Sequence, residues 1–126
     1  MKPRFEAALL LGCLTLAGCR GTEPQDRADL GALRLDILRV IGTPSCADSA
    51  DCAVIAVGSK PCGGPWEYLI YSRAGTDTTA LFDRVRNYNA LQESLNKKWG
   101  WVSDCSLAHK PRAGCRNGVC VDLDRP

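Results

Sequence analysis

The stretch that decides the fold, residues 76–100, reads TDTTALFDRVRNYNALQESLNKKWG. Its large apolar residues recur every three or four positions, which is the repeat of one helical face. They are Leu81, Val85, Tyr88, Leu91, Leu95 and Trp99. Thr76 or Asp77 can cap the first turn, and Gly100 can end the last one. The pattern predicts a helix of about six turns, roughly 30 Å long.

Two short apolar segments precede this helix. Residues 53–57 (AVIAV) and 66–72 (WEYLIYS) are rich in β-branched and aromatic side chains, so both are predicted strands. Residues 58–65 (GSKPCGGP) lie between them and contain three glycines and two prolines, which is typical of a loop. The two strands can pair as a hairpin whose long loop carries Cys62.

A helical repeat of the same kind begins at Asp29. It is carried by Leu30, Leu33, Ile37, Leu38 and Ile41. Gly42 and Pro44 follow where a helix should stop. The alternation of apolar residues at 33, 35 and 37 also allows a strand, which is the poorer alternative.

The C-terminal part contains CRNGVC at residues 115–120. Asn117-Gly118 is a preferred pair for a two-residue hairpin turn, because both positions need positive φ. The turn places Cys115 opposite Cys120, at a separation that a disulfide can span. Two alternatives stay open here. Either these two cysteines bond to each other, or each bonds to another partner such as Cys52, Cys62 or Cys105. Upstream, residues 101–105 are a predicted short strand and 106–114 a loop.

Together these elements predict one α+β domain. We expect a small antiparallel sheet with the long helix on one face and the N-terminal helix beside it. The chain has 126 residues, which suits a single domain. It also has 8 cysteines, a density that indicates an oxidising compartment and a disulfide-stapled fold.

The N-terminus has the features of an export signal. Lys2 and Arg4 precede an apolar run over residues 7–17, which is shorter than the roughly 20 residues that a transmembrane helix needs. The run ends in LAGC at residues 16–19, which resembles the lipobox of bacterial lipoproteins. That resemblance implies cleavage before Cys19 and attachment of acyl chains such as palmitate to it. The alternative is an ordinary signal peptide that happens to end in LAGC.

The resemblance divides the chain into a lipoprotein signal peptide (1–18), an acylated cysteine with a flexible tether (19–28) and a cystine-rich domain (29–126). Six cysteines then remain, which is enough for three disulfides. They are Cys46, Cys52, Cys62, Cys105, Cys115 and Cys120. Arg20 follows the lipidated position instead of aspartate, which resembles sorting to the outer membrane, facing the periplasm. Inner-membrane and surface locations are less favoured.

Nearly the whole mature chain supports one further resemblance. The segments C…DC (46–52), CGGPWEYLIYS (62–72), YN (88–89), SDC (103–105) and CRNGVC (115–120) resemble a group of small, uncharacterised bacterial cysteine-rich lipoproteins. No activity is known for that group, so the resemblance does not suggest one for this chain.

The sequence names no catalytic residues, no metal ligands and no cofactor. His109 is the only histidine and could pair with Ser103, Ser106 or Asp104, but no glycine-flanked nucleophile motif accompanies it. CxxC and HExxH are absent as well. The acidic pairs Asp48/Asp51 and Asp122/Asp124 are interpreted as solvated acids and not as calcium ligands. The net charge of +2 lacks the basic excess of a nucleic-acid-binding surface.

A binding loop is the remaining candidate site. Its residues are Lys60, Pro61, Gly63, Gly64, Pro65 and Trp66. A cystine and two prolines would stiffen the loop, and a rigid loop with an aromatic anchor binds at low entropic cost. In the alternative interpretation the glycines only make the turn and Trp66 joins the core, as we expect for Trp99 and Trp101.

These observations favour a non-enzymatic, inhibitor-like binding module of the cell envelope. We expect it to contact the lipid bilayer through Cys19 and an envelope protein through its domain. The alternative is a small periplasmic hydrolase that uses His109, or a thiol-redox enzyme.

Overall fold

The computed structural model describes residues 21–125, so the predicted signal peptide and Cys19 lie outside the described residues. The elements, in order, are α1 (Glu23–Ile41), a 3-10 turn (Ser49–Asp51), β1 (Cys52–Val57), β2 (Glu67–Ser72), α2 (Thr78–Trp99), β3 (Ala113–Arg116) and β4 (Val119–Asp122). This content confirms the predicted α+β class. Within residues 21–125, no helix combines the length and the hydropathy needed to cross a membrane.

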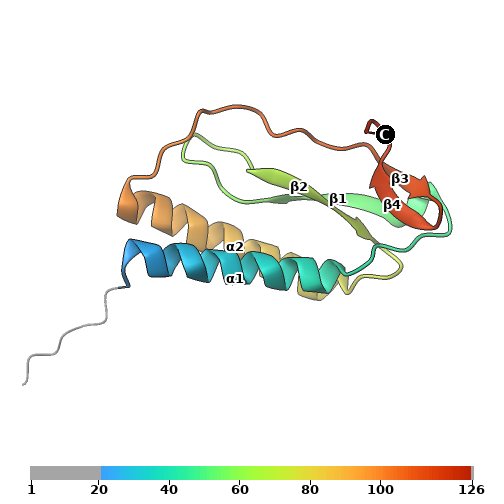
Figure 1. Ribbon diagram of the computed structural model, residues 1–126, viewed down its shortest axis with the longest axis horizontal. Helices are drawn as coiled ribbons and strands as arrows, with labels where there is room; N and C mark the ends of the chain where they lie inside the picture. The colour runs from blue at the N-terminus through green and yellow to red at the C-terminus, as the bar shows by residue number, and fades with distance from the viewer. Residues whose placement is uncertain (1–20, 126) are drawn as a thin grey trace, which may run out of the picture.

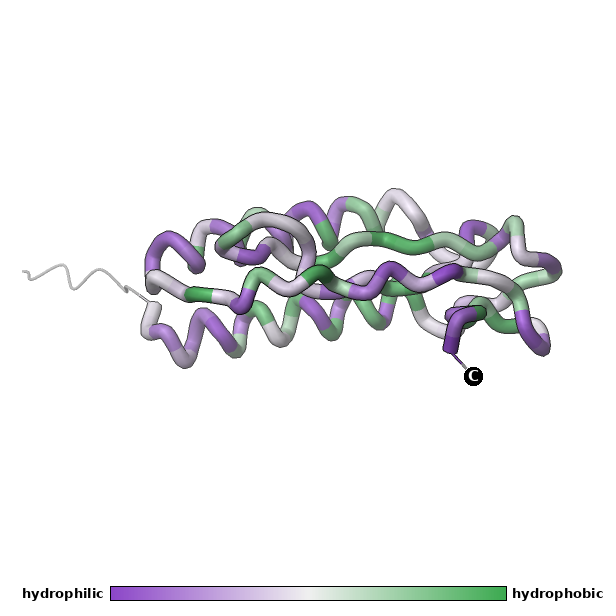
Figure 2. Tube along the Cα trace, turned by 90° about the horizontal axis from the view of Figure 1, so that it is seen from above, coloured by the Kyte–Doolittle hydropathy of each residue, from purple (hydrophilic) through white to green (hydrophobic). Residues whose placement is uncertain are grey.

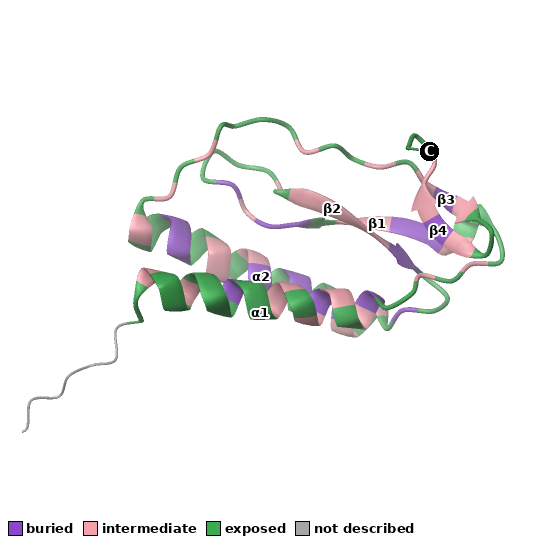
Figure 3. Cartoon of the chain, viewed as in Figure 1, coloured by how far each residue is buried: buried purple, intermediate pink, exposed green. Residues whose placement is uncertain are grey.

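The two helices lie side by side and run in opposite directions (Figure 1). The β1–β2 ribbon lies along one side of this pair, and the β3–β4 hairpin lies at the end where α1 stops and α2 starts. Ile37 and Leu81 are fully buried and belong to one core with Val57 and Tyr71. Hydrophobic and hydrophilic residues alternate along both helices (Figure 2), and buried residues recur along them (Figure 3).

The long helix is confirmed. Asp77 caps α2, because its side chain accepts a hydrogen bond from the Ala80 N–H at 2.9 Å. Gly100 ends the helix with a φ of 63°. The predicted apolar face packs inward, with Leu91 and Trp99 partly buried and the other members buried.

The predicted tether is wrong from Glu23 onward, because α1 starts there. Thr22 caps the helix, with its side chain accepting from the Gln25 N–H. This first part of α1 has no apolar repeat, since it contacts α2 and the following segment through polar side chains. Asp26 accepts hydrogen bonds from Lys98 and Trp99. The strand alternative for residues 33–37 is also wrong.

The strands form two two-stranded antiparallel sheets and not a single one. In the first, Val54 lies opposite Ile70. In the second, the predicted Asn117-Gly118 turn is confirmed, with both residues at positive φ. The strand predicted over 101–105 is wrong. That stretch belongs to an irregular segment, residues 101–112, which runs alongside the β1–β2 ribbon (Figure 1).

All six cysteines of the described chain are paired. The disulfides are Cys46–Cys115, Cys52–Cys120 and Cys62–Cys105, with Cα separations of 5.9, 5.5 and 5.8 Å. Cys115 and Cys120 lie opposite each other, as predicted, but they bond to different partners. A lone hairpin has little stability of its own. The two bridges instead tie it to β1 and to the segment before β1.

Candidate functional site

The loop between β1 and β2 is bound to α2 by three amide side chains. The Gly58 N–H donates to Asn89 Oδ1 and the Ser59 N–H donates to Gln92 Oε1, both at 2.7 Å. Asn96 Nδ2 donates to the Ser59 carbonyl at 2.8 Å. The three amides are three and four residues apart, so they form a row along one side of the helix. This row was not predicted from the sequence. The only local sign of it is the helical spacing of the three amide residues.

A disulfide and a lysine hold the other side of the loop. Cys62 bonds to Cys105 in the 101–112 segment. Lys60 Nζ donates to the carbonyl and the hydroxyl of Ser106 in the same segment. Lys60 is only 6% exposed, so it supports the loop from inside and does not contribute to its surface. Pro61, Gly63 and Gly64 are exposed.

Trp66 ends this loop and stays 42% exposed, so it does not join the core. Its backbone N–H donates to the Val57 carbonyl at 3.0 Å, and Lys60 Nζ lies 5.0 Å from the ring centre. A Cβ atom at Gly58 would lie 2.8 Å from Trp66 Cδ1, so only glycine lets the indole approach this closely. The side chain is therefore both positioned and accessible.

Trp66 lines a hollow between the two helices and the start of the 101–112 segment, with a volume of about 550 Å³. We call it the aromatic hollow, because Tyr88 and Trp101 line it too. Arg27 stacks on Trp101, with its guanidinium carbon 4.1 Å from the ring centre. Burial, and then the nearby Glu67 carboxylate, raise the pKa of Tyr88 above its ordinary value. Tyr88 is itself buried, so it forms part of the wall of this hollow.

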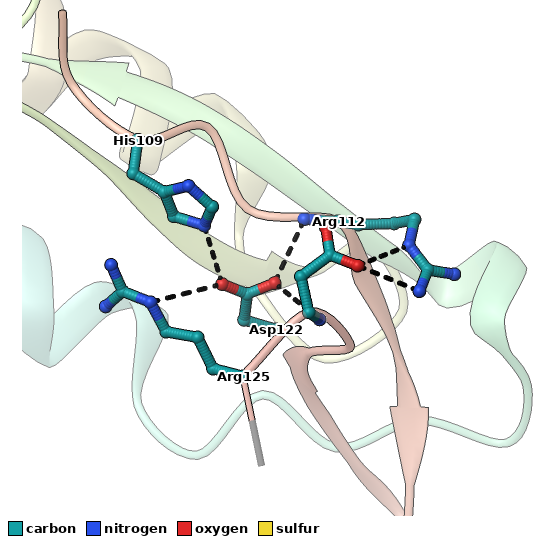
Figure 4. Close-up of polar contacts among 5 residues, drawn as sticks. His109, Arg112, Asp122 and Arg125 are labelled. Atoms are coloured by element: carbon teal, nitrogen blue, oxygen red, sulfur yellow. Dashed lines mark hydrogen bonds and ion pairs between the residues drawn. The ribbon is translucent and has the colours of Figure 1, made fainter.

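A second hollow of about 410 Å³ lies on the other side of Trp66 and includes His109 and Asp122 in its lining. His109 Nε2 lies 2.9 Å from Asp122 Oδ2 (Figure 4). The predicted partners Ser103, Ser106 and Asp104 do not take this place. Within residues 21–125, Asp122 is the hydrogen-bond partner found for the His109 ring. A histidine oriented by a carboxylate can act as a base, but a catalytic set also needs a nucleophile beside it.

Asp122 is held by several donors at once. Partial burial raises its pKa, but hydrogen bonds outweigh this effect and the pKa lies below the ordinary value. The donors are His109 and the backbone N–H groups of Asp124 and Arg112. The Arg112 side chain in turn pairs with Asp124 at 2.9 Å (Figure 4). Both carboxylates of the Asp122/Asp124 pair therefore accept hydrogen bonds from other groups of the protein.

The acids of the 3-10 turn are also engaged. Asp48 accepts from the Ala50 N–H, and Asp51 accepts from the Ala47 N–H, both at 2.7 Å. The Sγ atoms of Cys46, Cys52 and Cys120 lie within 4.8 Å of one another. All three belong to disulfides, so they do not provide the thiolates that a metal ion requires.

No family model, curated protein or solved structure matches this chain.

Proposed function

We propose that this protein is a lipid-anchored lipoprotein of the cell envelope that acts as a non-enzymatic binding module. The observation that carries the proposal is the exposed Trp66 on a loop held from two sides. Large aromatic side chains dominate the energetics of many protein interfaces. A loop that is already ordered loses little conformational entropy when it binds. The binding surface is centred on Trp66 and includes the exposed loop residues Pro61, Gly63 and Gly64.

The two hollows support this role because they flank the exposed indole. A partner side chain could enter the aromatic hollow beside Trp66, whose lining also includes the polar residues Arg27 and Gln92. Its lining combines aromatic and polar residues, as the linings of many recognition sites do. An envelope protein is the partner class that we propose.

The test compares two aromatic side chains of similar exposure. Trp66 is 42% exposed and Phe82, on α2, is 44% exposed. The domain from residue 21 onward, with its three disulfides, is immobilised and challenged with envelope extract. We expect a partner to be retained by the wild type and by Phe82→Ala, and to be lost with Trp66→Ala. Equal retention by both variants, or none by the wild type, would count against the proposal.

The anchor is supported by the lipobox-like LAGC motif, and the three disulfides are compatible with an exported protein. Intact mass of the membrane-extracted protein tests it. We expect the mass of residues 19–126 with acyl chains added and six hydrogens lost. The location that we propose, the outer membrane facing the periplasm, is tested by separating the two membranes on a density gradient.

One observation favours a second candidate, a small periplasmic hydrolase. The His109–Asp122 pair lies at the edge of a hollow, where an oriented imidazole could activate water. His109→Ala should abolish hydrolysis of a panel of esters and amides, while Lys110→Ala should not. Activity that is absent, or that is unchanged in His109→Ala, would exclude this candidate. Every cysteine within residues 21–125 is in a disulfide, which offers no support for a thiol-redox enzyme.

A further inference from the structure

The site where the chain enters the domain is fixed by contacts between the start of α1 and the end of α2. Lys98 Nζ donates to the Gly21 carbonyl at 3.3 Å and to Asp26 at 2.6 Å. Trp99 donates its indole N–H to the same Asp26 carboxylate at 2.9 Å. Gly21 is thereby held at this end of the helical pair.

Two aromatic side chains and several charges gather there, and we call this end the helical tip. Trp101 donates its indole N–H to Glu23 at 2.7 Å. The Arg27 and Lys98 side chains lie over the Trp101 and Trp99 rings. Val102 follows and is 87% exposed. Tryptophan side chains are enriched at membrane–water interfaces, because the ring is apolar and its N–H is polar.

The remaining length of chain is very short. Gly21 lies two residues after Cys19, so their Cα atoms are at most about 7 Å apart. Each polar layer of a bilayer is roughly 5 to 8 Å thick. If acyl chains on Cys19 enter the hydrocarbon, that residue lies in the polar layer, and the Gly21 Cα lies within about 7 Å of that layer.

We infer that the helical tip lies against the lipid headgroups, with Trp101 and Val102 at the membrane surface. This inference rests on the proposed lipid anchor and adds the face that touches the bilayer. We name lipid headgroups as the contacting surface because Gly21 lies only two residues after the proposed lipid anchor at Cys19. The aromatic hollow includes Trp101 and Val102 in its lining, so it opens next to the bilayer.

The experiment places a photoreactive benzophenone amino acid at Val102 or, as a matched control, at Phe82. Val102 is 87% exposed, and Phe82 is 44% exposed with its ring edge-on to Tyr71, a position at which benzophenone keeps an aromatic ring. The two positions lie near opposite ends of α2, about 25 Å apart along the helix. Each lipidated full-length product is reconstituted in vesicles of phosphatidylethanolamine and phosphatidylglycerol and irradiated. Its mass is then measured by intact-protein mass spectrometry. We expect a lipid adduct at position 102 and none at 82.

A third variant keeps the probe at 102 and inserts about fifteen Gly and Ser residues between Arg20 and Gly21, which adds a mean reach of about 20 Å. The adduct should then be lost. An acylated protein that gives no adduct at 102, gives equal adducts at 102 and 82, or keeps its adduct after the insertion would overturn the inference alone. A protein that carries no acyl chains before irradiation would overturn the anchor and this inference with it.

Discussion

Replacing Cys62 and Cys105 together by serine removes the disulfide that closes the loop beneath Trp66. The two cysteines are 43 residues apart. For a loop of that size, the chain-entropy model predicts about 4 kcal/mol of stabilisation. The other two disulfides enclose this one and already restrict the unfolded chain, so we expect a smaller loss, about 3 kcal/mol.

We expect no further loss of stability from a change in buried surface. Both cysteines are exposed, so the serines leave no cavity and bury no hydroxyl group. The hydrogen bonds from the loop to Asn89 and Gln92 remain available in the folded state. The loss should therefore come from a freer unfolded chain and not from a damaged native structure.

Urea denaturation followed by tryptophan fluorescence measures this loss, with the other two disulfides intact. We expect a lower midpoint and a slightly larger m value, because the unfolded chain exposes more surface when it has one cross-link fewer. The comparison variant is Cys52→Ala/Cys120→Ala, whose disulfide is buried and closes 68 residues. It should lose more. A loss below about 1 kcal/mol for Cys62→Ser/Cys105→Ser would refute the chain-entropy reasoning.

Three further predictions concern single features. Gly58→Ala should lower the free energy of unfolding by about 1 to 3 kcal/mol and displace Trp66, because φ at this position is +94° and the new Cβ would meet the indole. Gly31→Ala is the control, because this position lies on α1 with open space around it. It should raise the free energy of unfolding by up to about 1 kcal/mol. Urea titrations of both variants check this, and equal effects would contradict it. Hydrogen bonds from Trp101 to Glu23 and from Lys98 to Asp26 lower the pKa values of both acids. Their stabilisation is complete above about pH 5 and is lost as the pH falls through the lowered pKa values, so tryptophan emission should change on acidification in the wild type and not in Glu23→Gln/Asp26→Asn. Mild reduction should open Cys62–Cys105 first, because it is the exposed disulfide. Alkylation and peptide mass analysis would contradict this if Cys52 or Cys120 were labelled earlier.

Local patterns predicted α2 and both hairpins, because each depends on residues close in sequence. The caps at Asp77 and Gly100 and the turn at Asn117-Gly118 act within a few positions. The start of α1 has a local cap at Thr22, but its first turns have no apolar repeat by which the helix could be recognised. Its first turns are stabilised by Lys98, Trp99 and Trp101, more than 70 residues away.

The candidate site was predictable as a loop but not as a supported surface. Glycines, prolines and Trp66 identify the loop. The amides Asn89, Gln92 and Asn96 lie in a helix, where polar residues usually face water, so nothing local assigns them to the loop. Lys60 also appears from sequence as a surface cation, and only packing makes it a buried support.

The sequence alone determined the class of the fold, its longest helix, its two turns and the even set of six cysteines. It could not determine the pairing, because six cysteines allow fifteen arrangements that share one composition. The tertiary structure decided that Cys115 and Cys120 bond to different partners, that Trp66 remains exposed and that Lys98 holds Gly21 at the helical tip. Each of these depends on contacts between residues far apart in sequence, which form only when α1, α2 and the ribbon pack together.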